Sequence, residues 1–326
     1  MKTLIKVRNL RKLFPIKRSL WDVLLRKPEQ FVHAVDGISF NIFKGEIFGL
    51  VGESGCGKTT TGRLLLRLIE PTDGKVFFKD VNIYDIDPKE MKKYRRKMQI
   101  IFQDPYESLN PRMTIFDIVC EPLILHKVGS SEERIEIVSK TLEDVELTPP
   151  EEFMFRYPHE LSGGQRQRVA IARAIVLNPE FIVADEPVSM LDVSIRADIL
   201  NLLIKLRDEY GLSILFITHD LAVARHLCHR IAVMYLGKIV EIGPVDKIVY
   251  NPQHPYTKAL LAAVPVPDPT AEGVKILVKG EVPHAVSPPP GCRFHPRCPM
   301  AEEICRKKEP KLKEVEPNHL VACHMV

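Results

Sequence analysis

Hydrophobic positions in the first 250 residues follow two patterns: short continuous apolar runs, and longer runs with an apolar residue every three or four positions. The short runs predict buried strands and the longer period predicts amphipathic helices. Because the two alternate, we expect an α/β fold with a largely parallel sheet. The expected strands are Ile38–Ile42, Ile47–Val51, Met98–Gln103, Phe181–Asp185, Ser213–Thr218 and Arg230–Tyr235, and the expected helices include Lys58–Leu68, Gly164–Leu177 and Ser194–Glu209.

Two segments interrupt this alternation. Residues from about 105 to 175 show mainly helical patterning, which predicts a helical subdomain inserted into a domain spanning residues 1–250. A second, irregular domain is expected over residues 251–326, because its first part is rich in proline and its last part in cysteine. The prolines of the expected connector are Pro265, Pro267, Pro269, Pro283 and Pro288–Pro290.

Composition narrows the class of protein. The 326 residues are 45% hydrophobic and 27% charged, as in ordinary globular proteins. A net charge of +4 is too small to predict nucleic-acid binding by itself. No run approaches the ~18 apolar residues of a membrane span, and the N-terminus lacks the apolar core of a signal peptide. We therefore expect a soluble, cytoplasmic chain that can still work at a membrane surface.

The most specific motif follows the expected strand Ile47–Val51. Residues 52–59 read GESGCGKT, the GxxxxGK[ST] pattern between a strand and a helix. Its glycines let backbone N–H groups surround phosphate oxygens, and the helix N-terminus adds its positive end. We expect Lys58 to contact the β- and γ-phosphates and Thr59 to ligate Mg²⁺. The expected ATP-binding residues here are Gly52, Ser54, Gly55, Cys56 (through its backbone, without a metal role), Gly57, Lys58, Thr59 and Thr60.

Two further segments carry candidate chemistry. The strand Phe181–Asp185 ends in a carboxylate that we expect to hold Mg²⁺ through water, and Glu186 follows it as the group that polarises an attacking water. Residues Ser162–Gln165 open a helix, with Ser162 at the N-cap position. Free N–H groups at such a helix start predict a second anion-binding surface, although a structural capping box would explain the same residues.

Taken in order, these motifs resemble the ATP-binding subunit of an ABC transporter. The phosphate loop is followed by Gln103 after a strand, by LSGGQ at residues 161–165, by Asp185 and Glu186, and by Ser189-Met190-Leu191-Asp192. The histidine of the family pattern is His219. The resemblance implies that Ser162, Gly163, Gly164 and Gln165 of one subunit close over the γ-phosphate held by another subunit.

The resemblance also implies individual roles. Gln103 is expected to ligate Mg²⁺ and water and to link the core to the transmembrane subunits. Glu186 is expected to be the catalytic carboxylate, His219 to contact the γ-phosphate, and Asp192 to communicate between sites. Phe14 lies where the family places an aromatic residue that stacks on adenine.

Longer segments resemble the dipeptide/oligopeptide permease ATPases in particular. They are AVDGISF, VGESGCGKTT, IFQDPYESLNPR and NPQHPYTKALLAAVP, and the long N-terminal insert with Trp21 resembles the F-type subunit. The resemblance implies an ATPase that powers di- or oligopeptide import from the cytoplasmic face of the inner or plasma membrane, as a peripheral subunit. The implied partners are a D-type ATPase, two transmembrane permease subunits and a solute-binding protein, with no nucleic acid.

Two alternatives to peptide import stay open. Relatives of these permeases that import oligosaccharides would use the same kind of ATPase with another cargo. ABC-type ATPases of DNA repair or translation form another class, which usually carries two cassettes or a coiled-coil insert. This chain has one cassette and no heptad pattern, which disfavours that class.

Four cysteines crowd the end of the chain, namely Cys292, Cys298, Cys305 and Cys323. In a cytoplasmic chain, clustered thiols indicate a metal site before they indicate disulfides. Four thiolates suit either zinc or an iron–sulfur cluster, and the CxxC pairs usual for structural zinc are missing. Some members of the permease family carry a [4Fe–4S] cluster on this pattern, so the resemblance implies such a cluster here, with zinc as the alternative.

Overall fold

The computed structural model describes residues 2–18, 25, 28–263, 283 and 285–326. Trp21 of the expected insert and Pro265, Pro267 and Pro269 of the expected connector therefore lie outside the described residues. The chain forms two compact units. Unit 1 comprises residues 1–2, 43–46 and 85–217, and unit 2 comprises Thr3–Ile42, Ile47–Tyr84 and Thr218–Val326.

Unit 1 is built on parallel strands. β7 (Phe181–Asp185) pairs with β6 (Met98–Ile101) on one side and with β8 (Ser213–Thr218) on the other. Every residue of β7 and β8 is buried, which explains why both appear in the sequence as continuous apolar runs. Parallel pairing brings the carboxyl ends of these strands to one edge of the sheet, where the segments after Ile101 and Asp185 begin.

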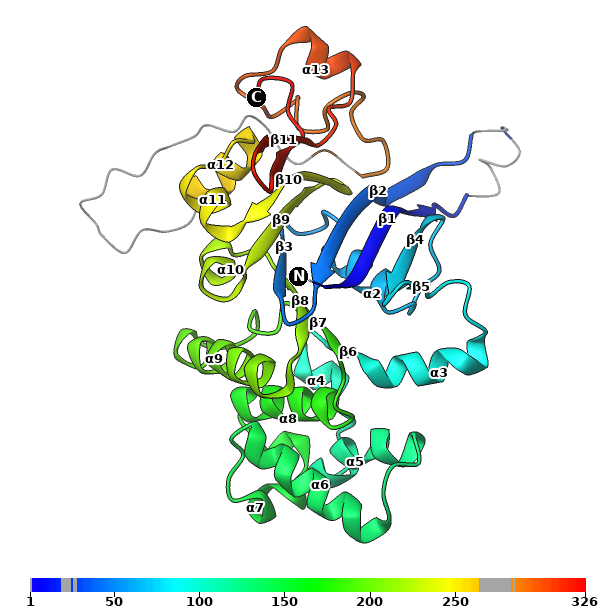
Figure 1. The fold of residues 1–326 in the computed structure, drawn as a ribbon, viewed down its shortest axis with the longest axis vertical. Helices are drawn as coiled ribbons and strands as arrows, with labels where there is room; N and C mark the ends of the chain where they lie inside the picture. Colours follow the sequence, from blue (N-terminus) through cyan, green and yellow to red (C-terminus); the bar gives the residue numbers. More distant parts are fainter. Residues whose placement is uncertain (1, 19–24, 26–27, 264–282, 284) are drawn as a thin grey trace, which may run out of the picture. The chain divides into compact units, whose positions relative to one another are not determined.

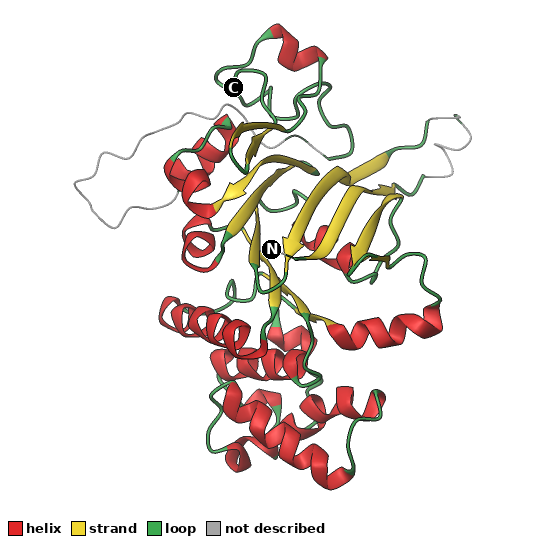
Figure 2. Ribbon diagram, viewed as in Figure 1, coloured by secondary structure: helices red, strands yellow, loops and turns green. Residues whose placement is uncertain are grey.

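The remainder of unit 1 is helical (Figures 1 and 2). Residues 105–175 are described throughout and contain helices but no strand. They share one compact unit with the strands, so a separate inserted subdomain is not confirmed. α8 contacts α4, α5, α6, α9 and β6. The helices are α3 (Pro88–Lys97), α4 (Pro105–Ser108), α5 (Ile115–Leu125), α6 (Ser131–Asp144), α7 (Pro150–Met154), the 3₁₀ turn η1 (Pro158–Glu160), α8 (Gly163–Ile175) and α9 (Val193–Tyr210).

Unit 2 contains an antiparallel sheet that the sequence analysis did not predict. Its strand order is β2 (Phe31–Phe43), β1 (Thr3–Pro15), β4 (Asp73–Phe78) and β5 (Val81–Asn82). The expected strand Ile38–Ile42 is the last part of the 13-residue β2. The rest was missed because charged residues interrupt the apolar ones in β1 and β2, as in strands that are buried on one face only.

The other strands of unit 2 run in the order β11 (Lys313–Glu316), β12 (His319–Val321), β10 (Lys238–Pro244), β9 (Arg230–Tyr235) and β3 (Ile47–Val51). β3 and β9 are parallel and the other pairs are antiparallel. Figure 1 shows α10 (Leu221–Leu227), α11 (Val245–Tyr250) and α12 (Pro255–Ala262) beside these strands. α2 (Lys58–Leu65) and α13 (Glu303–Lys307) complete the unit. None of the helices in the described ranges has the length and apolar character needed to span a bilayer.

The C-terminal tail, defined here as residues 285–326, is held by the rest of unit 2. β12 pairs with β10, with Glu241 opposite Val321 and Ile242 opposite Leu320. Phe294 of the tail is fully buried against Tyr235 of β9 and Tyr256 of α12, at ring-centroid distances of 5.3 and 5.4 Å. The tail therefore gains its order from an existing sheet and an aromatic cluster.

The predicted four-cysteine [4Fe–4S] site is wrong. All four cysteines, Cys292, Cys298, Cys305 and Cys323, are described, and the described residues contain no group of three or more His, Cys, Asp or Glu side chains that could hold a metal ion. The same finding gives no support to zinc. Burial raises the pKa of the Cys292 thiol to about 11 and also raises those of Cys298 and Cys323. The prediction treated the tail as an isolated segment that needed a metal, whereas strand pairing and aromatic packing order it.

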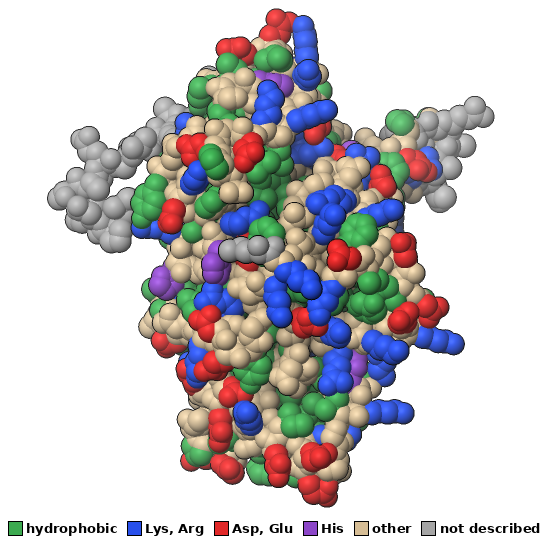
Figure 3. Space-filling model, viewed as in Figure 1, with side chains coloured by type: hydrophobic (Ala, Val, Ile, Leu, Met, Phe, Trp, Pro, Cys, Tyr) green, Lys and Arg blue, Asp and Glu red, His purple; other side chains and the backbone are tan. Residues whose placement is uncertain are grey.

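Both Lys and Arg (blue) and Asp and Glu (red) are scattered over the face shown in Figure 3. Helix α3 of unit 1 carries a local excess of cations, because its sequence PKEMKKYRRK has six basic residues and one acidic residue.

Candidate nucleotide-binding site

The phosphate loop lies between β3 and α2, as its sequence predicts. β3 is buried throughout, and α2 begins at Lys58 after Gly57, which has a left-handed φ of 108°. A Cβ on Gly57 would lie 2.0 Å from the carbonyl oxygen of Ala34, and one on Gly52 would lie 2.2 Å from that of Met234. Glycine is therefore required at both positions, because the loop is packed against backbone atoms on two sides.

Lys58 lies inside this loop. Its side chain is 4% exposed, and its Nζ donates to the carbonyl oxygens of Gly52 at 2.7 Å and Glu53 at 3.0 Å. Thr59 and Thr60 follow in the first turn of α2, which has no acidic residue to compete for an anion. The Lys58 ammonium group and the N–H groups at the start of α2 together provide the positive charge and the hydrogen-bond donors that bind an anionic phosphate chain.

Cys56 is buried in the phosphate loop, and its expected backbone contact with the phosphates stays a prediction. Its side chain is buried, and burial raises the pKa of its thiol, an effect that the nearby Lys58 partly offsets. The carbonyl oxygen of Cys56 accepts a hydrogen bond from the N–H of Gly237 at 2.9 Å. The loop is thus tied to the turn between β9 and β10.

In unit 1, Gln103 and Glu186 come together at the carboxyl ends of β6 and β7. Gln103 Nε2 donates to Glu186 Oε2 over 3.2 Å. Glu186 has a φ of 45°, a left-handed conformation that is rare for residues other than glycine, and its N–H donates to Ile217 at 3.0 Å. Asp185, the last residue of β7, is buried. Strain at a carboxylate beside a buried aspartate is typical of functional sites.

The segment Ser162–Gln165 forms a capping box at the start of α8. Ser162 Oγ accepts a hydrogen bond from Gln165 N–H at 3.3 Å, and Gln165 Oε1 accepts from Ser162 N–H at 2.9 Å. A Cβ on Gly164 would lie 2.7 Å from Ile195 Cγ2, so this glycine permits close packing of α8 on α9. Among the residues that the structure describes, a Cβ on Gly163 would meet Leu191 Cδ2 alone, at 3.6 Å. Packing of α8 on α9 therefore explains why residue 164 is glycine, but it does not explain the glycine at position 163.

The remaining predicted residues are placed at element boundaries. Asp192 precedes α9 without a side-chain capping bond, and His219 follows β8 on the surface. Phe14, near the end of β1, is 38% exposed, and Lys12 Nζ lies 5.0 Å from the centroid of its ring. An exposed ring can stack on a base, but no contact in the structure tests this role, and it stays a prediction.

The contacts of Glu53, the second residue of the phosphate loop, were not predicted from the sequence. Its carboxylate is paired with Arg297 of the tail, and its N–H donates to the Tyr256 hydroxyl at 3.0 Å. The sequence of the loop does indicate that Glu53 needs a cationic partner, because an unpaired carboxylate in a phosphate-binding segment would repel the phosphates. The sequence does not show which of the 46 lysines and arginines supplies it.

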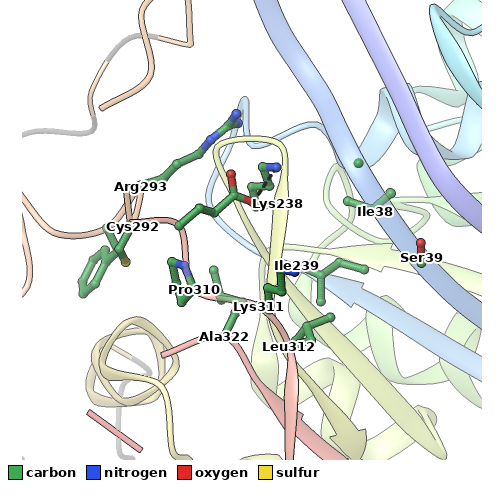
Figure 4. A pocket seen from close by; sticks show the side chains of 14 residues that line it. Ile38, Ser39, Lys238, Ile239, Cys292, Arg293, Pro310, Lys311, Leu312 and Ala322 are labelled. Atoms are coloured by element: carbon green, nitrogen blue, oxygen red, sulfur yellow. Dashed lines mark ion pairs between the residues drawn. The ribbon is translucent and has the colours of Figure 1, made fainter. Parts of the chain in front are cut away.

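A cavity of about 250 Å³ lies elsewhere in unit 2, between β2, β10 and the tail (Figure 4). Of the predicted site residues, only Cys292 lines it. Three of its charged lining residues are engaged in ion pairs: Lys238 pairs with Glu309 at 2.7 Å, and Arg293 pairs with Asp36. The cavity is not part of the candidate site.

Comparisons with known proteins agree with this geometry. Residues 35–189 match the model of the ABC transporter family, and residues 240–305 match that of the C-terminal region of oligopeptide/dipeptide transporters. The first range includes the phosphate loop, Gln103, LSGGQ and Glu186, and the second includes α12 and three of the four tail cysteines.

Individual relatives cover most of the chain. The putative oligopeptide transport ATP-binding protein YkfD of Bacillus subtilis is 53% identical over 297 residues, which are 90% of this chain and 90% of that protein. The oligopeptide transport ATP-binding protein AppF of the same organism is 48% identical over 326 residues, or 99% and 97% of the two chains. The dimeric structure of MJ0796, a bacterial ABC transporter cassette, matches with a TM-score of 0.64 at 33% identity and covers 74% of this chain and 99% of its own.

Proposed function

Because the chain belongs to the ABC transporter family of ATP-binding proteins, we propose that it is the ATP-hydrolysing subunit of an importer for di- and oligopeptides. The observation that carries the cargo class is the match of residues 240–305 to the oligopeptide/dipeptide transporter C-terminal region. Similarity to two oligopeptide transport ATP-binding proteins over at least 90% of the chain supports the same assignment.

In this proposal, each candidate site residue has a separate role in binding or hydrolysing ATP. The loop amides and Lys58 bind the phosphates, and Phe14 stacks on the adenine. Glu186 takes the proton from the attacking water, and Gln103, which is hydrogen-bonded to it, orients the carboxylate. His219 contacts the γ-phosphate, and Asp192 relays the state of one site to the next.

The donor set also suits Mg²⁺. Thr59, Asp185 and the amide oxygen of Gln103 offer hard oxygen ligands, which this ion prefers. When bound, Mg²⁺ supplies positive charge against the phosphate oxygens. Asp185 is buried at the end of β7 and precedes Glu186 in the sequence, which is consistent with a carboxylate that serves a cation.

Gly163, in the signature segment, is only partly buried, and among the described residues a Cβ there would approach Leu191 alone. We infer that Ser162–Gln165 meets the nucleotide of a second ATPase, and the resemblance to the peptide permeases makes a D-type paralogue the expected partner. Two transmembrane permease subunits and a solute-binding protein complete the importer. The chain is then a peripheral subunit on the cytoplasmic face of the inner or plasma membrane.

We further propose a division of labour along the chain. Residues 1–250 form the ATP-binding domain, within which residues 105–175 act as the helical subdomain that carries the signature segment. Residues 251–326 form the C-terminal, cysteine-rich region typical of peptide importers. The helical content of residues 105–175 and the anchoring of the tail on β10 support this division.

Uptake measurements test the proposal. In cells that lack the gene, uptake of a labelled oligopeptide should be lost, and plasmid-borne wild-type protein should restore it while Lys58→Ala should not. A labelled oligosaccharide is measured in parallel. Loss of oligosaccharide uptake with intact peptide uptake would reassign the cargo, and intact uptake of both would contradict the role in import.

Isolated ATPase activity provides a second measurement. Because the site is completed by another subunit, the purified chain alone should turn over ATP slowly, and adding the D-type ATPase with the membrane subunits should raise the rate. Full activity in a strictly monomeric preparation would contradict the composite site. A rate that rises with DNA or ribosomes instead would indicate the class of non-transport ABC ATPases.

A further inference from the structure

We propose that the C-terminal tail and α12 position the phosphate loop, with Arg297 and Tyr256 as positioning residues for ATP binding. The inference rests on the proposed ATPase function and adds a role for the part of the chain that lies outside the ATPase motifs. All of the contacts that carry it lie within unit 2.

The first contact is an ion pair between the tail and the loop. Arg297 Nη1 lies 2.9 Å from Glu53 Oε2, and Arg297 Nη2 lies 3.2 Å from Glu53 Oε1. Two parallel bonds from one guanidinium fix the orientation of the carboxylate as well as its position. The Arg297 side chain is only 11% exposed, so solvent screens this pair less than it screens a surface ion pair.

The second contact holds the backbone of the same loop residue. The hydroxyl of Tyr256 accepts a hydrogen bond from the Glu53 N–H at 3.0 Å. The Tyr256 ring packs at centroid distances of 4.6 Å from Tyr235 and 5.4 Å from Phe294, and all three residues are buried. The hydroxyl is thus presented by a packed aromatic cluster that includes a tail residue.

The third contact reaches the phosphate loop at Cys56, three residues after Glu53. Arg293 of the tail donates to the carbonyl oxygen of Leu236 and pairs with Asp36, and the next residue of that turn, Gly237, donates to Cys56 in the loop. Figure 4 shows Arg293 extending from the tail toward this turn. The tail therefore holds the loop both at Glu53 and, through the turn, at Cys56.

The start of α12 is itself fixed by the tail. The buried carboxylate of Glu241 accepts hydrogen bonds from the N–H groups of Gln253 and His254, at 2.8 and 3.1 Å, and its Oε1 lies 2.7 Å from His319 Nε2 of β12. Through these bonds β12 and β10 set the position of the helix that carries Tyr256.

The positive charge of Arg297 should also affect ATP binding, because it neutralises the carboxylate of Glu53. Glu53 places a carboxylate in a loop that binds anionic phosphates, and an unpaired carboxylate there would repel them. Paired with Arg297, it contributes no net charge, and Lys58 keeps its attraction for the phosphates. Loss of Arg297 should therefore weaken ATP binding both by freeing the loop and by exposing a negative charge.

Binding of Mg²⁺-ATP to the purified chain and ATP turnover by the assembled transporter test the proposal. We expect Arg297→Ala to raise the Kd and the KM for ATP by about tenfold, as loss of a charge-assisted pair implies, with little change in kcat. Tyr256→Phe, which keeps the ring, should raise KM by a smaller factor. The matched control is Lys247→Ala, which breaks the partly exposed ion pair between Lys247 of α11 and Glu316 of the tail and should leave both constants unchanged.

A double variant separates positioning from simple folding. Adding Glu53→Gln to Arg297→Ala removes the unpaired carboxylate and should recover the part of the affinity that its charge costs, but not the part lost with the two-pronged contact. A tail that had merely unfolded would not respond, and complete recovery would show that Arg297 acts through charge alone and would overturn its positioning role. If Arg297→Ala does not yield folded protein, Arg297→Lys keeps the charge without the two-pronged contact and should still raise KM. Unchanged ATP affinity in the folded Arg297 variant, or no recovery in the double variant, would overturn the proposal, and absence of ATP binding by the wild type would instead overturn the proposed function.

Discussion

Gln103 Nε2 lies 3.2 Å from Glu186 Oε2, although 83 residues separate the two in sequence. The parallel pairing of β6 and β7, with Ile101 opposite Ala184, brings the segments after both strands to the same edge. A carboxylate that receives an amide hydrogen bond is held in one orientation, which is what a base that accepts a proton from water needs.

Glu186→Gln should leave ATP binding intact and remove most hydrolysis. The glutamine keeps an oxygen that can accept from Gln103, so the local geometry survives while the base is lost, and such a loss lowers rates by ~10²–10⁴-fold. Phosphate release and nucleotide binding, measured on the assembled transporter, check this. Turnover near the wild-type rate would assign the base to another residue.

Gly163→Ala should preserve the fold and impair ATP turnover. Within the described part of the chain, the new Cβ would meet Leu191 Cδ2 alone, at 3.6 Å, which is an ordinary contact. The thermal midpoint should therefore be unchanged, while closure over a second subunit suffers. Gly164→Ala is the comparison, because its Cβ would lie 2.7 Å from Ile195 and should lower the midpoint. Normal turnover with Gly163→Ala would argue against contact of this segment with a nucleotide.

Gly57→Ala should abolish ATP binding. Its Cβ would lie 2.0 Å from the Ala34 carbonyl oxygen, in addition to the strain of a positive φ. Gly45→Ala is the matched control, because Gly45 also has a positive φ of 74° but nothing within 4 Å of its Cβ. The control should lose about 1 kcal/mol of stability without a change in ATP affinity, which nucleotide titration and denaturation together measure. Retained binding by the Gly57 variant would contradict the role of the tight turn.

Acidification should destabilise the chain through His254. Burial lowers the pKa of this imidazole to about 3, with Lys258 adding to the effect, and its Nδ1 accepts a hydrogen bond from the Tyr256 N–H at 3.0 Å. Because the unfolded histidine titrates near 6.5, this contribution is complete above pH 6.5 and is lost as the pH falls toward 3. At pH 5 the loss is about 2 kcal/mol, from 1.36 kcal/mol per pH unit.

His254→Asn isolates this contribution. Asparagine can cap α12 in place of the imidazole but does not titrate, so the variant should lose less stability between pH 7 and pH 5 than the wild type. Denaturation midpoints at the two pH values give the difference, since all other titrating groups are common to both proteins. Equal losses would show that His254 is protonated in the folded chain without penalty.

The sequence by itself determined the features that depend on neighbouring residues. Four predicted strands, Ile47–Val51, Phe181–Asp185, Ser213–Thr218 and Arg230–Tyr235, coincide with β3, β7, β8 and β9, because strands buried on both faces are continuous apolar runs. The sequence also predicted that the phosphate loop lies between a strand and a helix, and it indicated the capping box at Ser162. Both are local features, because their hydrogen bonds join residues a few positions apart. Residue spacing alone decides such contacts.

Tertiary structure decided the features that join distant segments. β1 and β2 are long antiparallel strands whose mixed polar and apolar pattern predicts burial of one face but names no partner. The cysteine pattern indicated a metal because a short polar tail was considered without the sheet that orders it; β12 on β10 and Phe294 in the aromatic cluster supply that order instead. Arg297 and Glu53 are 244 residues apart, and no local pattern selects one cation among many for one carboxylate. Only packing of the tail on β9, β10 and α12 brings the two together, because an ion pair of this geometry requires both backbones to be fixed first.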